Sequence, residues 1–151
     1  MKAVIQRVSS AQVEVAGETV GAIETGLLVL LGVQPEDASP EVAWMVDKIL
    51  GLRIFADEQQ PERKNMNRSV MDIGGSVLVV SQFTLAADTS RGRRPSFGSA
   101  AAPEQANAIY QQTVEQLQKK IPTQTGVFGA DMQVSLTNDG PVTFILESPI
   151  A

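Results

Sequence analysis

Residues 74–85 read GGSVLVVSQFTL, and this stretch decides how the rest of the sequence is interpreted. Residues 77–80 form an unbroken apolar run rich in β-branched side chains, a pattern typical of a strand buried on both faces. Ser81, Gln82 and Thr84 follow directly. Polar groups at the end of a core strand must be hydrogen-bonded or serve a ligand, because leaving them dry and unpaired costs about 1–3 kcal/mol each. The strand end is therefore a candidate site, although the same alternation also suits an ordinary half-exposed strand.

The chain before this stretch is predicted to form further strands and a helix. The strands are expected at residues 1–15, 19–23, 27–33 and 52–55, and the helix at residues 39–50. Short links between the first three strands imply an antiparallel meander. Ser39 is the expected N-cap of the helix, with Pro40 at its first position. Trp44 falls at the edge of the apolar face of this helix, so it belongs either to the core or to a contact with a second subunit.

The chain after this stretch predicts a second helix and two more strands. Apolar residues recur at helical spacing over residues 103–120, and strands at residues 132–136 and 142–146 flank a turn at residues 138–141. No repeat or linker divides the sequence, so residues 1–151 are expected to form a single domain. The predicted fold class is α+β: a mixed, mostly antiparallel sheet curled towards a barrel, with two helices packed on one side.

The composition narrows the possible chemistry. The chain has no cysteine and no histidine. These absences remove thiolate nucleophiles, disulfides, the Ser-His-Asp arrangement and histidine-ligated metals. Any catalysis must therefore use carboxylates, lysine, backbone dipoles or groups of the substrate, and no metal or other cofactor is expected.

Charge and hydropathy predict the location of the protein and the kinds of molecule that it binds. The longest apolar run, residues 27–31, is far too short to span a bilayer, and the first residues lack the apolar core of a signal peptide, so we expect a cytoplasmic protein without membrane contacts. The net charge of −5 argues against broad binding of DNA or RNA. A nucleic-acid substrate would need a local patch, for which Arg91, Arg93 and Arg94 are the best candidates. The cations of the polar loop at residues 56–68, Arg63 and Lys64 among them, suit either RNA contact or solvated surface.

Two motifs together resemble the signatures of the D-aminoacyl-tRNA deacylases. They are SQFTL at residues 81–85 and NDGPVT at residues 138–143, and the resemblance extends to MKAVIQRV at the start, MNRSVMDIGG and RGRRPSF. It covers almost the whole chain. The resemblance implies a carboxylic ester hydrolase that releases a free D-amino acid from tRNA during translation quality control. It also implies a homodimer with its active sites at the interface and aminoacyl-tRNA as the substrate.

The resemblance assigns the ester chemistry to the first motif. Ester hydrolysis places negative charge on the former carbonyl oxygen, and backbone N–H groups around Gln82, Phe83 and Thr84 are expected to stabilise it, with Ser81 in the same catalytic segment. The resemblance implies that the attack on the ester is assisted by the 2′-hydroxyl of the terminal ribose of the tRNA. Thr84 is interpreted as a positioning group rather than a nucleophile, since no base adjoins it in the motif. Asp88 is the nearest carboxylate in sequence, and its orientation stays open.

The second motif is expected to select the hand of the substrate. In the family a cis Gly-Pro dipeptide, here Gly140 and Pro141 followed by Val142 and Thr143, projects into the active site of the partner subunit. It lies where the side chain of an L-amino acid would have to go, so that L-substrates are rejected sterically. Glycine has no side chain to clash, so glycyl-tRNA, including glycine mischarged on tRNA-Ala, is expected to be cleaved as well. Arg7 matches an arginine that holds the dipeptide in the family, although a surface salt bridge is the alternative.

Two other classes of function remain open from the residues alone. A non-catalytic nucleotide- or nucleic-acid-binding protein would use the same strand end without turnover. A metal-dependent hydrolase using carboxylates alone is the other alternative, although the acidic residues are scattered and form no close pair in an apolar strand. Release of free amino acid from D-aminoacyl-tRNA separates the first from an enzyme, and activity in a chelator excludes the second.

Overall fold

The long first strand organises the sheet. A computed structural model describes residues 1–60 and 66–149. In it β1 (Lys2–Val15) pairs antiparallel with β6 (Gln133–Glu147) along nearly its whole length. β6 therefore takes one edge of β1, and β2 (Glu18–Ile23) and β3 (Gly26–Gly32) share the other edge in succession. The predicted meander is wrong, because β3 pairs with β1 and not with β2; a strand as long as β1 has room for both short strands.

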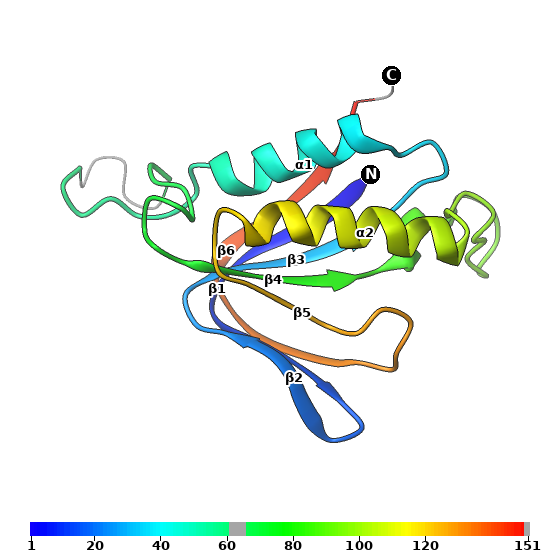
Figure 1. The fold of residues 1–151 in the computed structure, drawn as a ribbon, viewed down its shortest axis with the longest axis horizontal. Coiled ribbons are helices and arrows are strands. Elements are labelled where there is room, and N and C mark those ends of the chain that lie inside the picture. The colour runs from blue at the N-terminus through cyan, green and yellow to red at the C-terminus, as the bar shows by residue number, and fades with distance from the viewer. Residues whose placement is uncertain (61–65, 150–151) are drawn as a thin grey trace.

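Two parallel strands extend the sheet from β3 and make it mixed. β4 (Ser76–Ser81) pairs with β3, and β5 (Thr123–Thr125) pairs with β4. Figure 1 shows β3, β4 and β5 side by side, and the sheet curls so far that β2 contacts β5. At this point a Cβ on Gly21 would lie 2.3 Å from the carbonyl oxygen of Thr125, so only glycine allows the two backbones to come so close. The predicted class, a mixed sheet curled towards a barrel with two helices, is confirmed.

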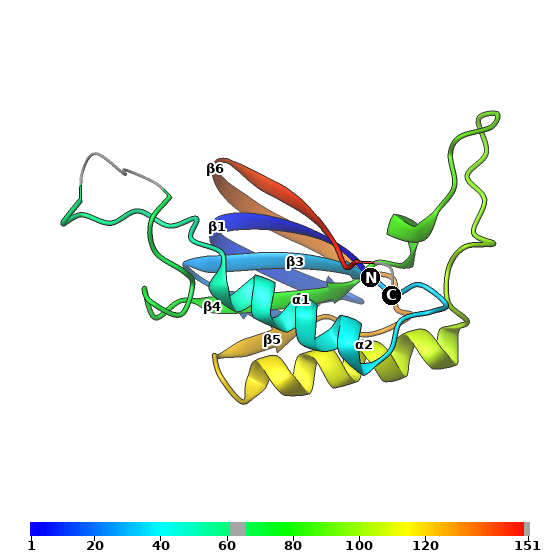
Figure 2. The same cartoon turned by 90° about the horizontal axis from the view of Figure 1, so that it is seen from above.

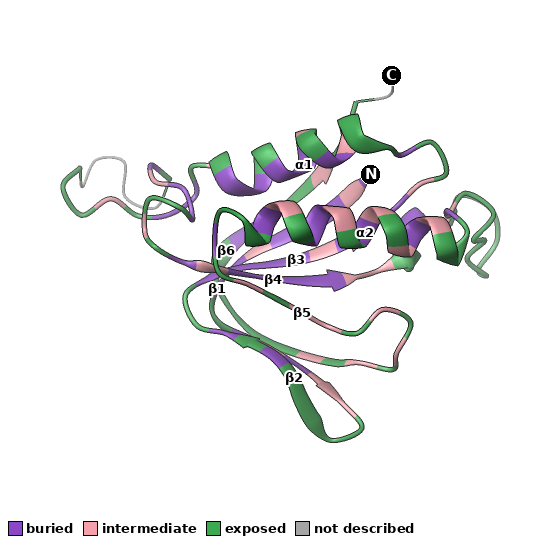
Figure 3. Ribbon diagram, in the orientation of Figure 1, coloured by how far each residue is buried: buried purple, intermediate pink, exposed green. Residues whose placement is uncertain are grey.

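Both helices pack on the same side of the sheet (Figure 2). α1 (Ser39–Gly51) and α2 (Pro103–Gln118) turn their apolar faces inward, where they are buried, and their polar faces outward (Figure 3). Among the described residues no helix is both long and apolar enough to cross a membrane. The phenol of Tyr110 on α2 donates to the carbonyl oxygen of Val79 at 2.9 Å. This bond fixes α2 against the strand that leads to the candidate site.

The first helix begins one residue earlier than expected. Ala38, not Ser39, is the N-cap, and it has no side-chain capping bond of its own. The carboxylate of Glu41 instead accepts from the N–H of Ala38 at 2.8 Å. The hydroxyl of Ser39 is thereby free for another contact and accepts from Nε2 of Gln112 on α2 at 3.0 Å. Trp44 is half-buried and packs against the core, while the contact with a second subunit stays a prediction.

The segment after α1 is extended but is not a strand. Residues 52–55 were expected to pair in the sheet, yet Phe55 makes only an isolated bridge with Arg68. The carbonyl of Ile54 is taken by the guanidinium of Arg7 at 2.8 Å, so this backbone is satisfied by a side chain and not by a ladder. Within the polar loop that follows, Arg63 and Lys64 lie outside the described residues.

Candidate active site

A cavity of about 500 Å³ opens where β4 ends. Its walls come from the end of β4, the start of the short 3-10 helix η2 (Phe83–Ala86), the N-terminal end of α2 and the segment that leads into β6. The residues that line it are Val80, Ser81, Gln82, Phe83, Ala101, Pro103, Ala106, Phe128, Gly129, Ala130, Asp131, Met132 and Val134. Ser81, Gln82 and Phe83 thus line a cavity at the end of this strand.

The turn from β4 into η2 leaves backbone donors at the cavity. The N–H of Gln82 is already used, since it donates to the carbonyl of Leu31 at 2.8 Å. The N–H of Leu85 makes the first bond of η2, to the carbonyl of Gln82 at 3.2 Å. The N–H groups of Phe83 and Thr84 precede that bond and have no acceptor within η2. Of the three amides expected to meet an oxyanion, these two are therefore the ones that the helix leaves available.

The hydroxyl of Thr84 has an amide neighbour and not a base. Thr84 is exposed and, unlike Ser81, Gln82 and Phe83, does not line the cavity; its Oγ1 accepts from Nε2 of Gln82 at 2.6 Å. The carboxylate of Asp88 is engaged in its own turn, where Oδ1 accepts from the N–H of Ser90 at 2.9 Å. The side chain and then the backbone of Ser90 lower the pKa of Asp88 below its ordinary value. Asp88 is therefore an ionised surface group that makes this contact within its own loop.

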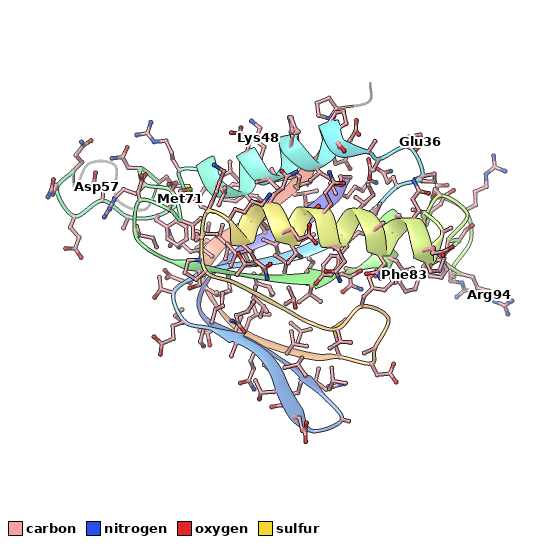
Figure 4. The ribbon with its side chains drawn as sticks, in the orientation of Figure 1. Glu36, Lys48, Asp57, Met71, Phe83 and Arg94 are labelled. Atoms are coloured by element: carbon pink, nitrogen blue, oxygen red, sulfur yellow. The ribbon has the colours of Figure 1, made fainter. Side chains whose placement is uncertain are left out.

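The arginine-rich loop stands next to the cavity. The backbones of Asp88 and Ser96 pair at the neck of this loop, and Arg91, Arg93 and Arg94 are exposed beyond them. In Figure 2 the loop projects away from the sheet, and Figure 4 shows Arg94 at its outer side with Phe83 near its base. The cations expected to meet tRNA are thus on a projecting, positively charged loop next to the cavity.

An exposed aromatic pair lies between the arginine-rich loop and η2. The rings of Phe83 and Phe97 are 5.2 Å apart at their centroids, and the two residues are 55% and 44% exposed. Two exposed phenylalanines in contact are uncommon on the surface of a soluble domain.

The second motif forms a bulge in β6 and not a turn between two strands. Gln6 of β1 faces Thr143 and Val8 faces Asn138, so residues 139–142 stand opposite Arg7 alone. The Gly140–Pro141 bond in this bulge is cis, and both residues are exposed. The two strands predicted at residues 132–136 and 142–146 are one interrupted strand, because both halves pair with the same partner, β1.

The remaining two residues of the motif anchor the bulge. Val142 is buried in the core, and the hydroxyl of Thr143 accepts from Nε2 of Gln6 at 3.2 Å. Arg7, only 5% exposed, directs its Nε at the carbonyl oxygen of Asp139 at 3.0 Å and at its carboxylate at 3.1 Å. The arginine is therefore buried and bound to the residue just before the dipeptide.

The cavity and the dipeptide of one chain lie apart. Arg7, opposite the bulge, pairs with Leu27, which pairs with Val77 at the beginning of β4. The cavity lies at the other end of β4, about 13 Å further along the strand direction. Figure 2 shows the same separation, with the middle of β6 and the residues after β4 at opposite ends of the sheet. Gly140 and Pro141 do not line the cavity.

Two parts of the site carry no clear signal in the sequence. Residues 128–132 form one wall of the cavity, and only the glycines at 126 and 129 marked this segment as a non-regular backbone. Asn138 was counted as part of a turn, although it bonds across the base of the bulge. Among the described residues no three acidic side chains gather closely enough to hold a metal ion.

Comparison with known proteins decides the family. The model of a family described as D-Tyr-tRNA(Tyr) deacylase matches residues 4–147. The chain belongs to the D-aminoacyl-tRNA deacylase family. Curated relatives of that name share 57% identity with it in Geobacter metallireducens, covering 100% of this chain and 98% of the relative, and 54% in Chlorobaculum tepidum, covering 99% and 98%. As a deacylase it is a hydrolase of tRNA proofreading, and its substrate is an aminoacyl-tRNA.

Solved structures agree with the fold of the deacylase. A structure titled c-Myc DNA Unwinding Element Binding Protein superposes with a TM-score of 0.93 at 48% identity, covering 99% of this chain and 100% of that one. The DNA binding in that title is a property of that protein. A probable eukaryotic D-amino acid tRNA deacylase superposes with a TM-score of 0.80 at 17% identity, over 96% of this chain and 97% of that chain, and shows the fold alone.

Proposed function

We propose that this deacylase cleaves the ester of D-aminoacyl-tRNA and rejects L-aminoacyl-tRNA by a steric filter. One subunit supplies this filter to the active site of the other. The filter is Gly140–Pro141, and the ester is bound at the cavity beyond β4. The observation that carries the proposal is their separation: the dipeptide is exposed, at the far end of the sheet from the cavity of its own chain. A second copy of the chain can bring the two together.

The outer edge of β6 supports a homodimer of this kind. Within the described residues β6 pairs only with β1, so its other edge is free to pair. Phe144 and Ile145 follow the dipeptide on this strand, and Ile145 is 73% exposed. An exposed strand edge with large apolar side chains is typical of a surface that a partner covers. The same contact would carry the dipeptide of one subunit towards the cavity of the other.

The bond-breaking step in this proposal relies on backbone and substrate. As the carbonyl carbon becomes tetrahedral, its oxygen takes negative charge, which the N–H groups of Phe83 and Thr84 stabilise; loss of one such donor costs about 2.7–4 kcal/mol in other enzymes. Water attacks this carbon with the assistance of the 2′-hydroxyl of the terminal ribose of tRNA, the ester bond to the ribose breaks, and free amino acid and tRNA leave. Thr84 positions this segment through its bond with Gln82. The absence of histidine from the chain fits a mechanism in which no ionisable side chain acts as the general acid or base.

The tRNA itself is held by the arginine-rich loop in this proposal. Arg91, Arg93 and Arg94 are exposed next to the cavity, in a chain with a net charge of −5. Phosphates of the acceptor end are the natural partners of such a local cluster, because arginine binds them through charge and hydrogen bonds.

The filter is tested with three substrates. Purified chain is mixed with D-tyrosyl-tRNA, L-tyrosyl-tRNA and glycyl-tRNA, including glycine charged on tRNA-Ala, and free amino acid is measured. We expect cleavage of the D- and glycyl-substrates and resistance of the L-substrate. Equal cleavage of both mirror images contradicts the filter. A glycyl-tRNA that resists ample enzyme shows that rejection rests on something other than a side-chain clash.

The sharing between subunits is tested by mixing two variants. Pro141→Ala weakens the filter, and Ala130→Trp fills the cavity. In a mixed dimer the one open cavity faces an intact dipeptide from the other subunit. We therefore expect the mixed dimer to regain the selectivity that Pro141→Ala lacks. A mixed dimer that stays unselective places the dipeptide in its own chain's site and refutes the sharing.

A further inference from the structure

The side chain of Asn138 spans the base of the bulge that carries the dipeptide. Its Nδ2 donates to the carbonyl oxygen of Arg7 at 2.9 Å and to that of Val142 at 3.1 Å. One amide thus joins the central strand β1 to the far end of the bulge. Because both acceptors are carbonyl oxygens, only the nitrogen of the amide can face them.

This orientation sends the other end of the amide towards the dipeptide. A Cβ on Gly140 would lie 2.3 Å from Oδ1 of Asn138 and 3.1 Å from its Cγ. The oxygen thus occupies the space that any larger residue at position 140 would need. Gly140 has no positive φ that would itself demand glycine, so the need for glycine here comes from its neighbours, of which Oδ1 of Asn138 is the nearest and the backbone N of Val142, at 3.1 Å, is another.

The bulge lacks the regular support of a strand. Residues 139–142 have only Arg7 opposite them, so the ladder of hydrogen bonds that orients an ordinary strand is interrupted here. Arg7 holds the entry of the bulge at Asp139, and Asn138 ties its exit at Val142 back to β1. The position of the dipeptide relative to the sheet therefore depends on two side chains, Arg7 and Asn138.

We propose that Asn138 is a positioning residue of the chirality filter, which sets how far and in which direction Gly140–Pro141 projects. This inference rests on the proposed function of the dipeptide. A steric filter requires accurate placement, since a displacement of about 1 Å in a reacting site costs on the order of a hundredfold in rate. Asn138 touches the filter and not the ester, so its loss changes selectivity before it changes binding of tRNA.

The first test replaces the amide by a carboxylate of the same shape. Asn138→Asp removes both N–H donors and turns an oxygen towards two carbonyl oxygens. Asn107→Asp is the matched control, because Asn107 lies on α2 and is only an acceptor, from Gln111 at 3.4 Å. We expect Asn138→Asp to lower the ratio of D- to L-tyrosyl-tRNA cleavage by at least about tenfold, with KM for tRNA changed less than about twofold. The control keeps the ratio of the parent protein.

A double-mutant cycle keeps the inference testable if Asn138→Asp fails to fold. Gly140→Ala alone drives a methyl group against Oδ1 of Asn138 and lowers the D:L ratio. In the Asn138→Ala background this oxygen and Cγ are gone, and the nearest remaining atom is the N of Val142 at 3.1 Å. The extra loss caused by Gly140→Ala is therefore expected to be several-fold smaller in that background. Purely additive losses refute a direct contact between the two side chains as the positioning device.

The outcomes separate this inference from the function on which it rests. If Pro141→Ala lowers the D:L ratio and folded Asn138→Asp does not, the filter stands and the role of Asn138 is refuted. If neither variant changes the ratio, the filter itself is wrong. If both lower it and Asn138→Asp leaves KM for tRNA unchanged, Asn138 acts as proposed.

Discussion

The guanidinium of Arg7 binds the backbone of Asp139, with Nε 3.0 Å from its carbonyl oxygen. Nη1 of the same side chain lies 2.8 Å from the carbonyl oxygen of Ile54. One buried side chain therefore joins the entry of the β6 bulge to the segment that follows α1. Its planar group satisfies acceptors in two directions, which a single ammonium does not match.

Arg7→Lys is expected to weaken both stability and selectivity. Lysine keeps the charge but loses part of the hydrogen-bonding fork, so we expect the free energy of unfolding to fall by about 2 kcal/mol and the D:L ratio to drop. Urea unfolding and the two deacylation rates measure these effects. Arg93→Lys, an exposed change of the same kind, is the control for the free energy of unfolding. If the Arg7→Lys protein kept its free energy of unfolding, the hydrogen bond from Arg7 to the carbonyl oxygen of Ile54 would contribute nothing to stability.

Tyr110 provides a spectroscopic test of the packing of α2. It is the only tyrosine of the chain, and burial raises its pKa to about 12. Between pH 10 and 12 the folded chain keeps a proton that the unfolded chain releases, so stability falls as pH rises through this window, by at most about 1.4 kcal/mol per pH unit. Ultraviolet titration of the phenolate measures the midpoint directly. A midpoint near 10 in folded protein would contradict the buried contact with Val79.

Asp37 is expected to be important for stability. Its carboxylate accepts from the α-amino group of Met1 at 2.7 Å and from the N–H of Gln34 at 2.7 Å, and both ends of the ion pair are buried. Asp37→Asn leaves a buried ammonium without its counter-charge, so we expect a loss of about 3 kcal/mol in the free energy of unfolding. Asp47→Asn, on the exposed face of α1, is the control and should change little. If the two substitutions lowered the free energy of unfolding equally, the buried ion pair of Asp37 with Met1 would not stabilise the protein.

The arginine-rich loop predicts the salt dependence of tRNA binding. Replacing Arg91, Arg93 and Arg94 by glutamine should weaken binding and make the slope of log affinity against log salt shallower by about 2 to 3, because each phosphate contact contributes about 0.7 to 0.9. Binding titrations at several salt concentrations measure this slope. The same replacements at Lys119 and Lys120, at the other end of α2, should leave it unchanged. An unaltered slope in the arginine variant would place the RNA elsewhere.

Asp88 is expected to be dispensable for the chemistry. Its pKa is lowered by hydrogen bonds from Ser90, so it stays ionised down to acidic pH and contributes to stability above its unfolded pKa; this contribution is lost as pH falls through its folded pKa. Asp88→Asn should change kcat by less than about threefold, whereas removal of a general base costs about a hundredfold or more. Measuring kcat against pH for both proteins shows whether Asp88 is a general base, since only a general base would make kcat depend on its own ionisation.

Local pattern was sufficient for the elements that a single stretch defines. The apolar run at residues 77–80 predicted β4 and its burial, and the helical spacing after Pro103 predicted α2, because in both cases the residues that decide the structure are neighbours in sequence. The candidate site at Ser81 and Gln82 followed from the same logic, since polar residues at a buried strand end need partners.

Pairing over long distances could not be predicted in this way. The short links after Val15 and Ile23 suit a meander, but they do not reveal that β1 is long enough to hold β2 and β3 on one edge. Asn138 to Pro141 has the composition of an ordinary turn, and only the pairing of both flanking segments with β1 makes it a bulge. The wall formed by residues 128–132 has no local signal of function, because it becomes part of a cavity only when the chain is folded.

The partnership of β1 with β6 also bears on how the protein is made. Lys2 faces Glu147, so one edge of β1 is paired by a strand that lies far from it in the sequence. Contacts between such distant parts of a chain form slowly. Until β6 has been synthesised, this edge of β1 has no neighbour, and the nascent chain must be kept from pairing there with other unfinished chains.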